Sequence, residues 1–376
     1  MYSTSQEAWD AMYHAIAQAQ QTIYWELYIF VDDEVGSKFV SLLIQKAQAG
    51  VRVVLLFDRL GSSDLSQKTI STMKEAGIDI VLFSATHAKH STTYWRRLWS
   101  RTHRKVLIID ERIGFIGGVN VQKKMAQWKD IQLRVEGKTV HSLLRFFAKN
   151  YLIAGGDRQH VVHLLKYRFR VASQMEDVEI VYDEPGHRTS RARTKYIEAL
   201  AKARERVILF SPYYFPDKKL LRALWSARKR GIKVDILIPF RSDIRIATYA
   251  TYALFSLMNR RGVDVHLLKG EMMHGKGVIM DDEWAMIGSS NIDQTSFFDN
   301  YEANVRVSDT HTVRQLKTIV TGWIGSAEKI EGTVWSARGR VTKMKEWISL
   351  TLYKLWYRGS ERAETVRASK RLRKKK

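Results

Sequence analysis

One short pattern occurs twice in this chain, and the repeat limits the folds that the chain can adopt. Both copies read His-x-Lys-x4-Asp and comprise His103, Lys105 and Asp110 in HRKVLIID, and His274, Lys276 and Asp281 in HGKGVIMD. Each histidine is followed 17 residues later by an asparagine, Asn120 (103 to 120) or Asn291 (274 to 291). One copy could arise by chance, but two copies with matched continuations indicate a duplicated unit.

The repeat extends beyond the motifs. Gly50 and Gly231 each follow a helical pattern and precede an apolar strand pattern, and Gly77 and Gly262 do the same further along. Glycine at these points fits a helix C-terminus, where the backbone turns left-handed. Helices and strands therefore alternate in both halves, which predicts an α/β fold with largely parallel sheets.

We divide the chain into three parts: residues 1–172 with the first motif, 173–330 with the second, and a C-terminal segment, 331–376. The second half opens with a strand pattern, VEIVY at 178–182, that the first half lacks. We therefore expect this edge strand to be missing from the first half, or Met1 not to be the natural start.

The composition of the chain limits the classes of binding partner and of site that it can have. The 376 residues carry a net charge of +23, which calls for an anionic partner such as nucleic acid, acidic lipid or a phosphorylated substrate. Cysteine is absent, which excludes disulfides, thiolate metal sites and cysteine nucleophiles. The sequence has no signal-peptide pattern and no apolar run near 18 residues, so we expect a protein that is soluble or lies on a membrane.

The motif residues suit a phosphate diester. On an extended strand, residues two apart share a face, so each histidine should lie beside its lysine. One neutral imidazole can attack phosphorus to form a phosphohistidine, while the other, protonated, protonates the leaving alkoxide. The lysines would neutralise the phosphate, and we expect no metal or cofactor. Asp110 and Asp281 complete the motifs and are counted with the catalytic set, but they are out of phase with the histidines, so we expect a structural role.

Other residues should complete the site. Asn120, Asn291, Ser289 and the small Gly118 are expected at the phosphate, because a predicted hairpin after each motif returns them towards the histidines. Carboxylates fix histidine tautomers. Asp130 lies 27 residues after His103 (103 to 130), and Glu302 lies 28 after His274 (274 to 302), so these two acids are the candidates for orienting the imidazoles.

These motifs resemble the phospholipase D superfamily. More narrowly, RTHRKVLIIDERIGFIGGVN, SPYYFPDKKLLRALWSARKRGIKVDILIP and MHGKGVIMDDEWAMIGSSNID resemble bacterial cardiolipin synthases of the short B-type, over roughly residues 5–325. The resemblance implies a pseudo-dimer of two α/β sandwich halves with one active site at their interface. It also implies that His103 is the nucleophile and His274 the acid and base. The implied reaction joins two phosphatidylglycerols, or uses a related donor such as phosphatidylethanolamine, and releases glycerol.

Two segments suit a membrane surface. Before the first motif, aromatic residues alternate with arginines, and the expected contacts are Trp95, Arg96, Arg97 and Trp99. In the C-terminal segment an amphipathic helix with Trp347 and Trp356 precedes a tail, 358–376, with nine Lys/Arg and two Glu, a net +7. Packing of both segments on the protein itself is the alternative. We expect peripheral attachment to the cytoplasmic face of a bacterial inner membrane.

Other functions remain open. A phospholipase D would share the covalent step but use water as the acceptor. A nuclease would suit the positive charge, although nucleic acid is the less favoured partner. A non-catalytic binding module is disfavoured because both motifs are intact. No oligomer is required, since one chain holds both motifs.

Overall fold

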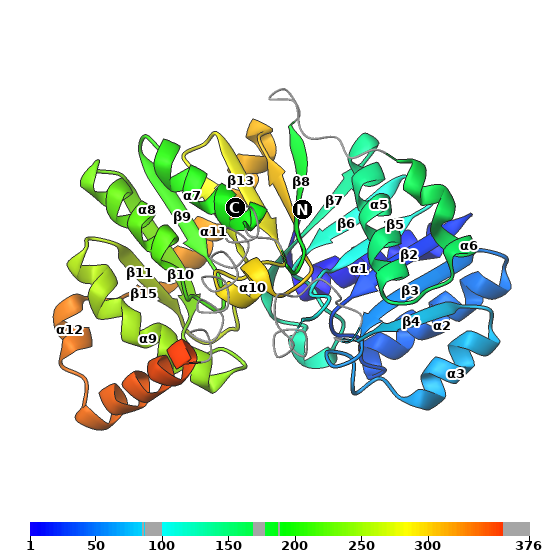
Figure 1. Ribbon diagram of the computed structural model, residues 1–376, viewed down its shortest axis with the longest axis horizontal. Helices are drawn as coiled ribbons and strands as arrows, with labels where there is room; N and C mark the ends of the chain where they lie inside the picture. Colours follow the sequence, from blue (N-terminus) through cyan, green and yellow to red (C-terminus); the bar gives the residue numbers. More distant parts are fainter. Residues whose placement is uncertain (85, 87–99, 168–176, 187–188, 356–376) are drawn as a thin grey trace, which may run out of the picture.

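The computed structural model describes residues 1–84, 86, 100–167, 177–186 and 189–355. Two mixed β-sheets lie side by side, one in each half, with helices around and between them (Figure 1). The predicted division at residue 172 falls outside the described residues and stays a prediction, although the first sheet ends at Glu136 and the second begins at Val178.

The first sheet has seven strands. Their spatial order is β1 (Tyr2–Thr4), β7 (Lys129–Glu136), β6 (Ile113–Gly117), β5 (Val106–Ile109), β2 (Thr22–Leu27), β3 (Arg52–Asp58) and β4 (Asp79–Phe83). Only β2, β3 and β4 are mutually parallel; β5, β6, β7 and β1 join by antiparallel pairing. The prediction of largely parallel sheets was therefore wrong, because each motif strand returns through a tight hairpin that forces antiparallel pairing.

The second sheet repeats this plan with one additional strand. Its spatial order is β15 (Ala327–Lys329), β11 (Asp264–Leu268), β10 (Lys233–Pro239), β9 (Arg206–Phe210), β12 (Gly277–Met280), β13 (Trp284–Gly288), β14 (Glu302–Val307) and β8 (Val178–Asp183). β8 pairs with β14 as β1 pairs with β7. The expectation that the first half lacks this edge strand was wrong: β1 is present but only three residues long, too short for its alternation to stand out.

Helices cover the outer faces and fill the space between the sheets. In the first half they are α1 (Ser5–Gln18), α2 (Glu34–Gln48), α3 (Gln67–Glu75), α5 (Lys138–Ile153) and α6 (Arg158–Val161). In the second half they are α7 (Arg191–Lys202), α8 (Lys218–Lys229), α9 (Arg245–Arg260), α10 (Gln294–Phe298), α11 (Thr310–Gly325), α12 (Gly332–Ser336) and a helix over 340–355. Gly50, Gly77, Gly231 and Gly262 have φ of 74° to 89°, which confirms the predicted left-handed helix ends.

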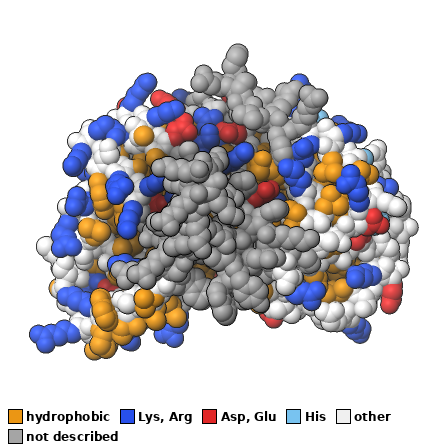
Figure 2. Space-filling model, viewed as in Figure 1, with side chains coloured by type: hydrophobic (Ala, Val, Ile, Leu, Met, Phe, Trp, Pro, Cys, Tyr) orange, Lys and Arg blue, Asp and Glu red, His pale blue; other side chains and the backbone are white. Residues whose placement is uncertain are grey.

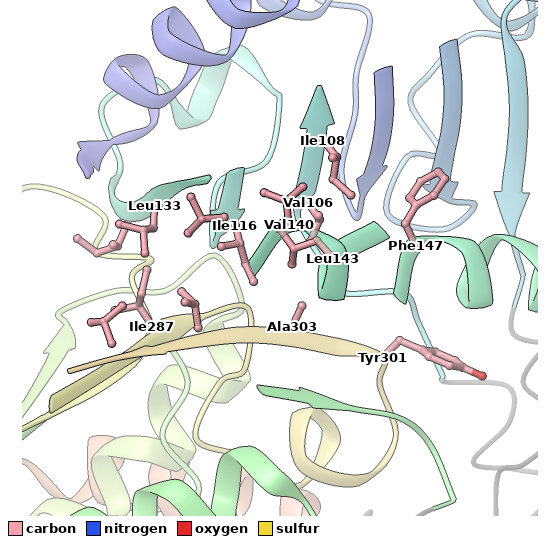
Figure 3. Close-up of a cluster of buried hydrophobic side chains, with 14 of the residues drawn as sticks. Val106, Ile108, Ile116, Leu133, Val140, Leu143, Phe147, Ile287, Tyr301 and Ala303 are labelled. Atoms are coloured by element: carbon pink, nitrogen blue, oxygen red, sulfur yellow. The ribbon is translucent and has the colours of Figure 1, made fainter. Parts of the chain in front are cut away.

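The two halves share one hydrophobic core. Apolar residues of β5, β6, β7 and α5 pack in a single cluster with residues of β13, β14 and α11. Figure 3 shows side chains of both halves meeting there, among them Ile116 and Leu133 from the first and Ile287 and Ala303 from the second. Because burying apolar surface is the main force in folding, this shared core fixes how the motif strands face each other. No helix among the described residues is long and apolar enough to cross a membrane.

Candidate active site at the interface of the halves

The histidine and lysine of each motif lie at the interface, immediately before the strand rather than within it. β5 begins one residue after Lys105, and β12 begins one residue after Lys276. The backbone before each strand instead pairs with the opposite half: Thr102 bridges Tyr301, and Met273 bridges Lys129. The predicted same-face placement of each histidine and lysine therefore rests on extended backbone clamped between the halves.

His103 is held by the second half. Its backbone N–H donates to the carbonyl of Tyr301 at 2.9 Å, and its Nδ1 lies 3.1 Å from both carboxylate oxygens of Glu302. Glu302 is fully buried, and Tyr28 packs edge-on against the imidazole with ring centroids 4.8 Å apart. The imidazole is thus fixed in orientation, with Nδ1 engaged and Nε2 left for chemistry.

His274 is held by the first half in the same way. Its backbone N–H donates to the carbonyl of Lys129 at 2.7 Å, and its Nδ1 lies 2.6 Å from Asp130 Oδ2. The Trp128 ring packs beside the imidazole at 5.2 Å. Asp130 and Glu302 therefore each contact a histidine, as the sequence spacing suggested, but each acid serves the histidine of the opposite half.

Burial sets the protonation of these groups. Burial lowers the pKa of His103 to about 4, assisted by the charge of Lys105 and opposed by Glu302. Burial also lowers the pKa of His274. For Glu302, burial raises the pKa, but the charge and hydrogen bond of His103 and the charge of Lys105 outweigh it, so the net pKa is lowered. Both imidazoles are consequently neutral at pH 7, and each Nδ1–H faces an ionised carboxylate.

The two lysines bring positive charge into a site that excludes water. Both are 1% exposed, and each ammonium donates to the carbonyl of its own motif histidine, Lys105 to His103 at 2.6 Å and Lys276 to His274. Burial lowers the pKa of Lys276 to about 8, against the opposing charges of Asp130 and Asp243, and lowers that of Lys105 well below its ordinary value. Because a buried charge without a counterion costs free energy, these two cations favour the binding of an anion.

The small residues after each motif make room for the acids. A Cβ on Gly118 would lie 2.2 Å from Asp130 Oδ1, so glycine is required for the carboxylate to reach His274. In the second half the corresponding Ser289 is tolerated because its hydroxyl donates to Glu302. The hydroxyl of Ser289 is thus engaged with the buried carboxylate, and its contact with phosphate stays a prediction.

The two asparagines lie where the hairpins end. Asn120 is buried, and its Oδ1 accepts from the backbone N–H of Ile29 at 3.1 Å. Asn291 is also buried, and its Oδ1 has no hydrogen-bond partner among the described residues. Their contact with phosphate stays a prediction.

Asp110 and Asp281 lie at the opposite ends of the motif strands. Asp110 has a positive φ of 51° and accepts from the N–H groups of residues 20–22, while Asp281, with φ of 50°, accepts from those of 204–206. Each lies five residues beyond its lysine, across a strand of four residues, a span of about 16 Å. This geometry supports the structural role and argues against placing them among the reacting groups.

The structure adds residues that sequence reasoning missed. Tyr28 flanks His103, but it corresponds in the repeat to Pro212, so comparison of the halves gave no signal. Arg104, inside the first motif, is 1% exposed and reaches the second half by donating from Nε to the carbonyl of Glu302 at 3.3 Å. Its counterpart in the repeat is Gly275, so the two motif histidines have unlike surroundings. Among the described residues no cluster of three His, Asp or Glu side chains is arranged as metal ligands.

Of the predicted membrane contacts, only Trp347 lies within the described residues, and it is 66% exposed. Trp95, Arg96, Arg97, Trp99 and Trp356 lie outside them.

Comparison with known proteins fits this geometry. A family model described as "Cardiolipin synthase, PLD-like domain" matches residues 12–149 and 196–322, which is well over half of the chain and includes both motifs. The chain belongs to the cardiolipin synthase family of PLD-like proteins. The family predicted from the motifs is thereby confirmed.

Individual members of the cardiolipin synthase family are similar over most of this chain. It is 33% identical over 322 residues to cardiolipin synthase B of Salmonella typhi, covering 84% of this chain and 77% of that protein. It is 29% identical over 349 residues to the probable cardiolipin synthase YwiE of Bacillus subtilis, covering 91% and 69%. For cardiolipin synthase 1 of Bacillus cereus the identity is 32% over 330 residues, covering 84% and 64%. The chain thus spans roughly two thirds of the length of these Bacillus relatives.

Solved structures show the same fold in distant proteins. Phosphatidylserine synthase of Haemophilus influenzae superposes with a TM-score of 0.72 at 13% identity, covering 97% of this chain and 94% of that one. Polyphosphate kinase of Porphyromonas gingivalis gives 0.60 at 16% identity, covering 88% and 47%. These similarities confirm the predicted α/β fold of two PLD-like halves.

Proposed function

We propose that this member of the cardiolipin synthase family is a phosphatidyltransferase that joins two phosphatidylglycerols and releases glycerol. The observation that carries the proposal is the crosswise pairing, in which each half supplies the acid that orients the other half's histidine. Such an arrangement gives two fixed imidazoles that can exchange the roles of nucleophile and proton carrier.

The first half-reaction uses His103 as the nucleophile. Its Nε2 lone pair attacks phosphorus, a P–N bond forms, and the P–O bond to the headgroup glycerol breaks. Positive charge then develops on the imidazole, beside the ionised Glu302. The departing glycerol oxygen takes a proton from His274, whose pKa rises when an anionic phosphodiester enters the site. Asp130 stabilises that imidazolium.

The second half-reaction reverses these steps. Neutral His274 takes the proton from a hydroxyl of the acceptor phosphatidylglycerol, whose oxygen attacks phosphorus. The P–N bond breaks, and its electron pair returns to His103. Throughout, Lys105 and Lys276 stabilise the negative charge on the non-bridging oxygens, an effect strengthened by their burial.

Purified protein incubated with labelled phosphatidylglycerol tests the proposal. The expected product is cardiolipin together with free glycerol, in equal amounts. Phosphatidic acid as the main product would instead establish a phospholipase D, in which water is the acceptor. Phosphatidylethanolamine in place of the donor tests the related substrate. Single-stranded DNA tests the nuclease alternative, and cleavage lost in His103→Ala would support it.

We also propose that the enzyme works as a peripheral protein at an anionic membrane surface, on the cytoplasmic face of a bacterial inner membrane. A phospholipid substrate resides in a bilayer, and the chain's net charge of +23 favours an anionic one. Fractionation of the native bacterium, with protease added to intact spheroplasts, tests the face. Digestion from outside would contradict it.

A further inference from the structure

The helix over 340–355 is oriented with its polar side towards the protein. Glu346 and Ser349 are 4% and 7% exposed, whereas the apolar side chains lie at the surface. The exposed set is Val341, Met344, Trp347, Ile348, Leu352 and Leu355. These residues, which we name the apolar ridge, form part of the hydrophobic patch at the lower left of Figure 2, where Figure 1 shows this helix. A soluble helix normally does the reverse, so the apolar ridge requires an apolar partner.

Contacts on the inner side hold the helix in this orientation. Glu346 accepts from the guanidinium of Arg338 at 2.6 Å, and the Cζ of that guanidinium lies over the ring of Trp335, 3.5 Å from its centroid. Further along, the ring of Tyr353 stacks on Phe215 at 3.8 Å. The outward direction of the apolar ridge is therefore fixed by specific inner contacts.

A pocket of about 480 Å³ opens beside the apolar ridge. Arg241, Arg245 and Arg338 contribute to its lining, together with aromatic rings and the helix residue Thr342, and no acid is among the lining residues. Arg241 and Arg245 are exposed, and neither is paired with a carboxylate within the described part of the chain. Arginine in such a setting suits a phosphate group.

Residues that line the pocket have exposed apolar side chains as their neighbours in the sequence. Arg245 lies between Ile244 and Ile246, which are 52% and 56% exposed, and Thr342 follows Val341 of the apolar ridge. The exposed charges of the helix are all positive, from Arg340, Lys343, Lys345 and Lys354. Apolar side chains flanked by cations match the boundary between the headgroups and acyl chains of an anionic bilayer.

The same segment leads to the active site. Asp243, two residues from Arg241 and Arg245, accepts from the hydroxyl of Tyr213, and its charge acts on both His274 and Lys276. Asp243, on the segment that carries Arg241 and Arg245, therefore links the rim of the pocket electrostatically to the catalytic groups.

We propose that this pocket binds the phosphate headgroup of an anionic phospholipid within the membrane, while the apolar ridge and Ile244 and Ile246 enter the headgroup–acyl boundary. It is a second lipid site, outside the catalytic centre. The inference deepens the proposed function and rests on it for the choice of a phospholipid over another anion.

Vesicle binding by the full chain tests the proposal. All variants carry His103→Ala, so no lipid is consumed and the result does not depend on turnover. The probes are phosphatidylcholine vesicles with and without about 30% phosphatidylglycerol, a content that gives a substantial surface potential. Arg241→Gln/Arg245→Gln should weaken binding to the anionic vesicles about 30-fold, corresponding to about 1 kcal/mol per charge.

A matched variant separates the pocket from net charge. Arg222→Gln/Arg260→Gln removes two exposed arginines on α8 and at the far end of α9. It should weaken binding less than about threefold, since charges beyond a Debye length of the surface contribute little. An equal loss of vesicle binding in both double variants would contradict the proposed headgroup site in the pocket.

Two further results complete the test. Thr342→Trp fills the pocket without changing charge and should also weaken binding, whereas unchanged binding would contradict the proposal. Soluble glycerol 3-phosphate should bind far more weakly than the vesicles; equal affinity would make this a site for a free anion. On monomeric short-chain phosphatidylglycerol, without His103→Ala, the Arg241/Arg245 variant should keep its activity. If the wild-type chain transfers no phosphatidyl group at all, the proposed function fails while the vesicle result stands.

Discussion

Replacing Glu302 by glutamine removes one negative charge beside the nucleophile while keeping the shape of the side chain. Glu302 is fully buried, and both of its oxygens lie 3.1 Å from His103 Nδ1. When His103 attacks phosphorus its ring becomes positive. At an effective dielectric constant of about 20, a charge pair at that distance is worth roughly 5 kcal/mol. A hydrogen bond from His103 Nδ1–H to the neutral carbonyl oxygen of glutamine restores about 1–2 kcal/mol.

The net loss of about 3–4 kcal/mol predicts a fall in kcat of roughly 200- to 1,000-fold. The assay is cardiolipin formation under saturating phosphatidylglycerol, with thermal unfolding to show that the variant is folded. A kcat within tenfold of the wild-type value would refute the reasoning, because it would mean that Glu302 does not stabilise the charge on His103.

Asp130→Asn is the matched control, since it acts on the proton donor instead. Asp130 lies 2.6 Å from His274 Nδ1, and in the first half-reaction it should matter only while the leaving group needs a proton. With phosphatidyl-p-nitrophenol, whose leaving group departs without one, Asp130→Asn should release nitrophenol in the first turnover at close to the wild-type rate. Glu302→Gln should stay slow on this substrate. Equal rescue of both variants would contradict the assignment of His103 as nucleophile.

Three other changes probe the site. Gly118→Ala should lower kcat about 10- to 100-fold, because the added methyl group displaces Asp130 from His274. The hydrogen bond that is lost involves a charged group and is worth about 1.5–3 kcal/mol. An unchanged kcat would count against this contact. Asp281→Asn should lower the free energy of unfolding, measured in urea, by about 1–2 kcal/mol and leave kcat nearly unchanged. A loss of kcat of about a thousandfold would instead show that Asp281 takes part in catalysis. Dimethyl phosphate, whose charge does not titrate, should bind up to tenfold more weakly per pH unit above about pH 8, because Lys276 (pKa about 8) then loses its proton before the anion binds. Lys276→Arg should remove that alkaline weakening in calorimetry.

The motif residues could be predicted from the sequence because their signal is local and doubled. Matched spacing also identified Asp130 and Glu302. Their crosswise pairing could not be predicted, since it depends on how the shared core of Figure 3 turns one sheet towards the other. The hydrophobic pattern of each half shows which residues are buried, but not how the two halves are oriented relative to each other.

Other misses have equally specific causes. The edge strand β1 is three residues long, so it presents no alternation to read. Tyr28 and Arg104 have no counterparts of the same chemistry in the second half. Comparison of the two halves, which identified the motif residues, therefore could not identify these two. The amphipathic pattern of 340–355 was visible in the sequence, but only the structure shows that its apolar side faces outward.

In the proposed mechanism two similar halves perform one asymmetric reaction, with His103 attacking and His274 carrying the proton. Which histidine carries the phosphatidyl group can be measured. The protein is mixed with phosphatidylglycerol that carries its label in the acyl chains and none in the headgroup. The reaction is quenched in alkaline denaturant, where P–N bonds survive. The protein is then digested, and its peptides are mapped by mass spectrometry. We expect a phosphatidyl group on His103, more abundant in Asp130→Asn with the activated substrate and absent in His103→Ala. A label on His274, or cardiolipin formed by His103→Ala, would contradict it.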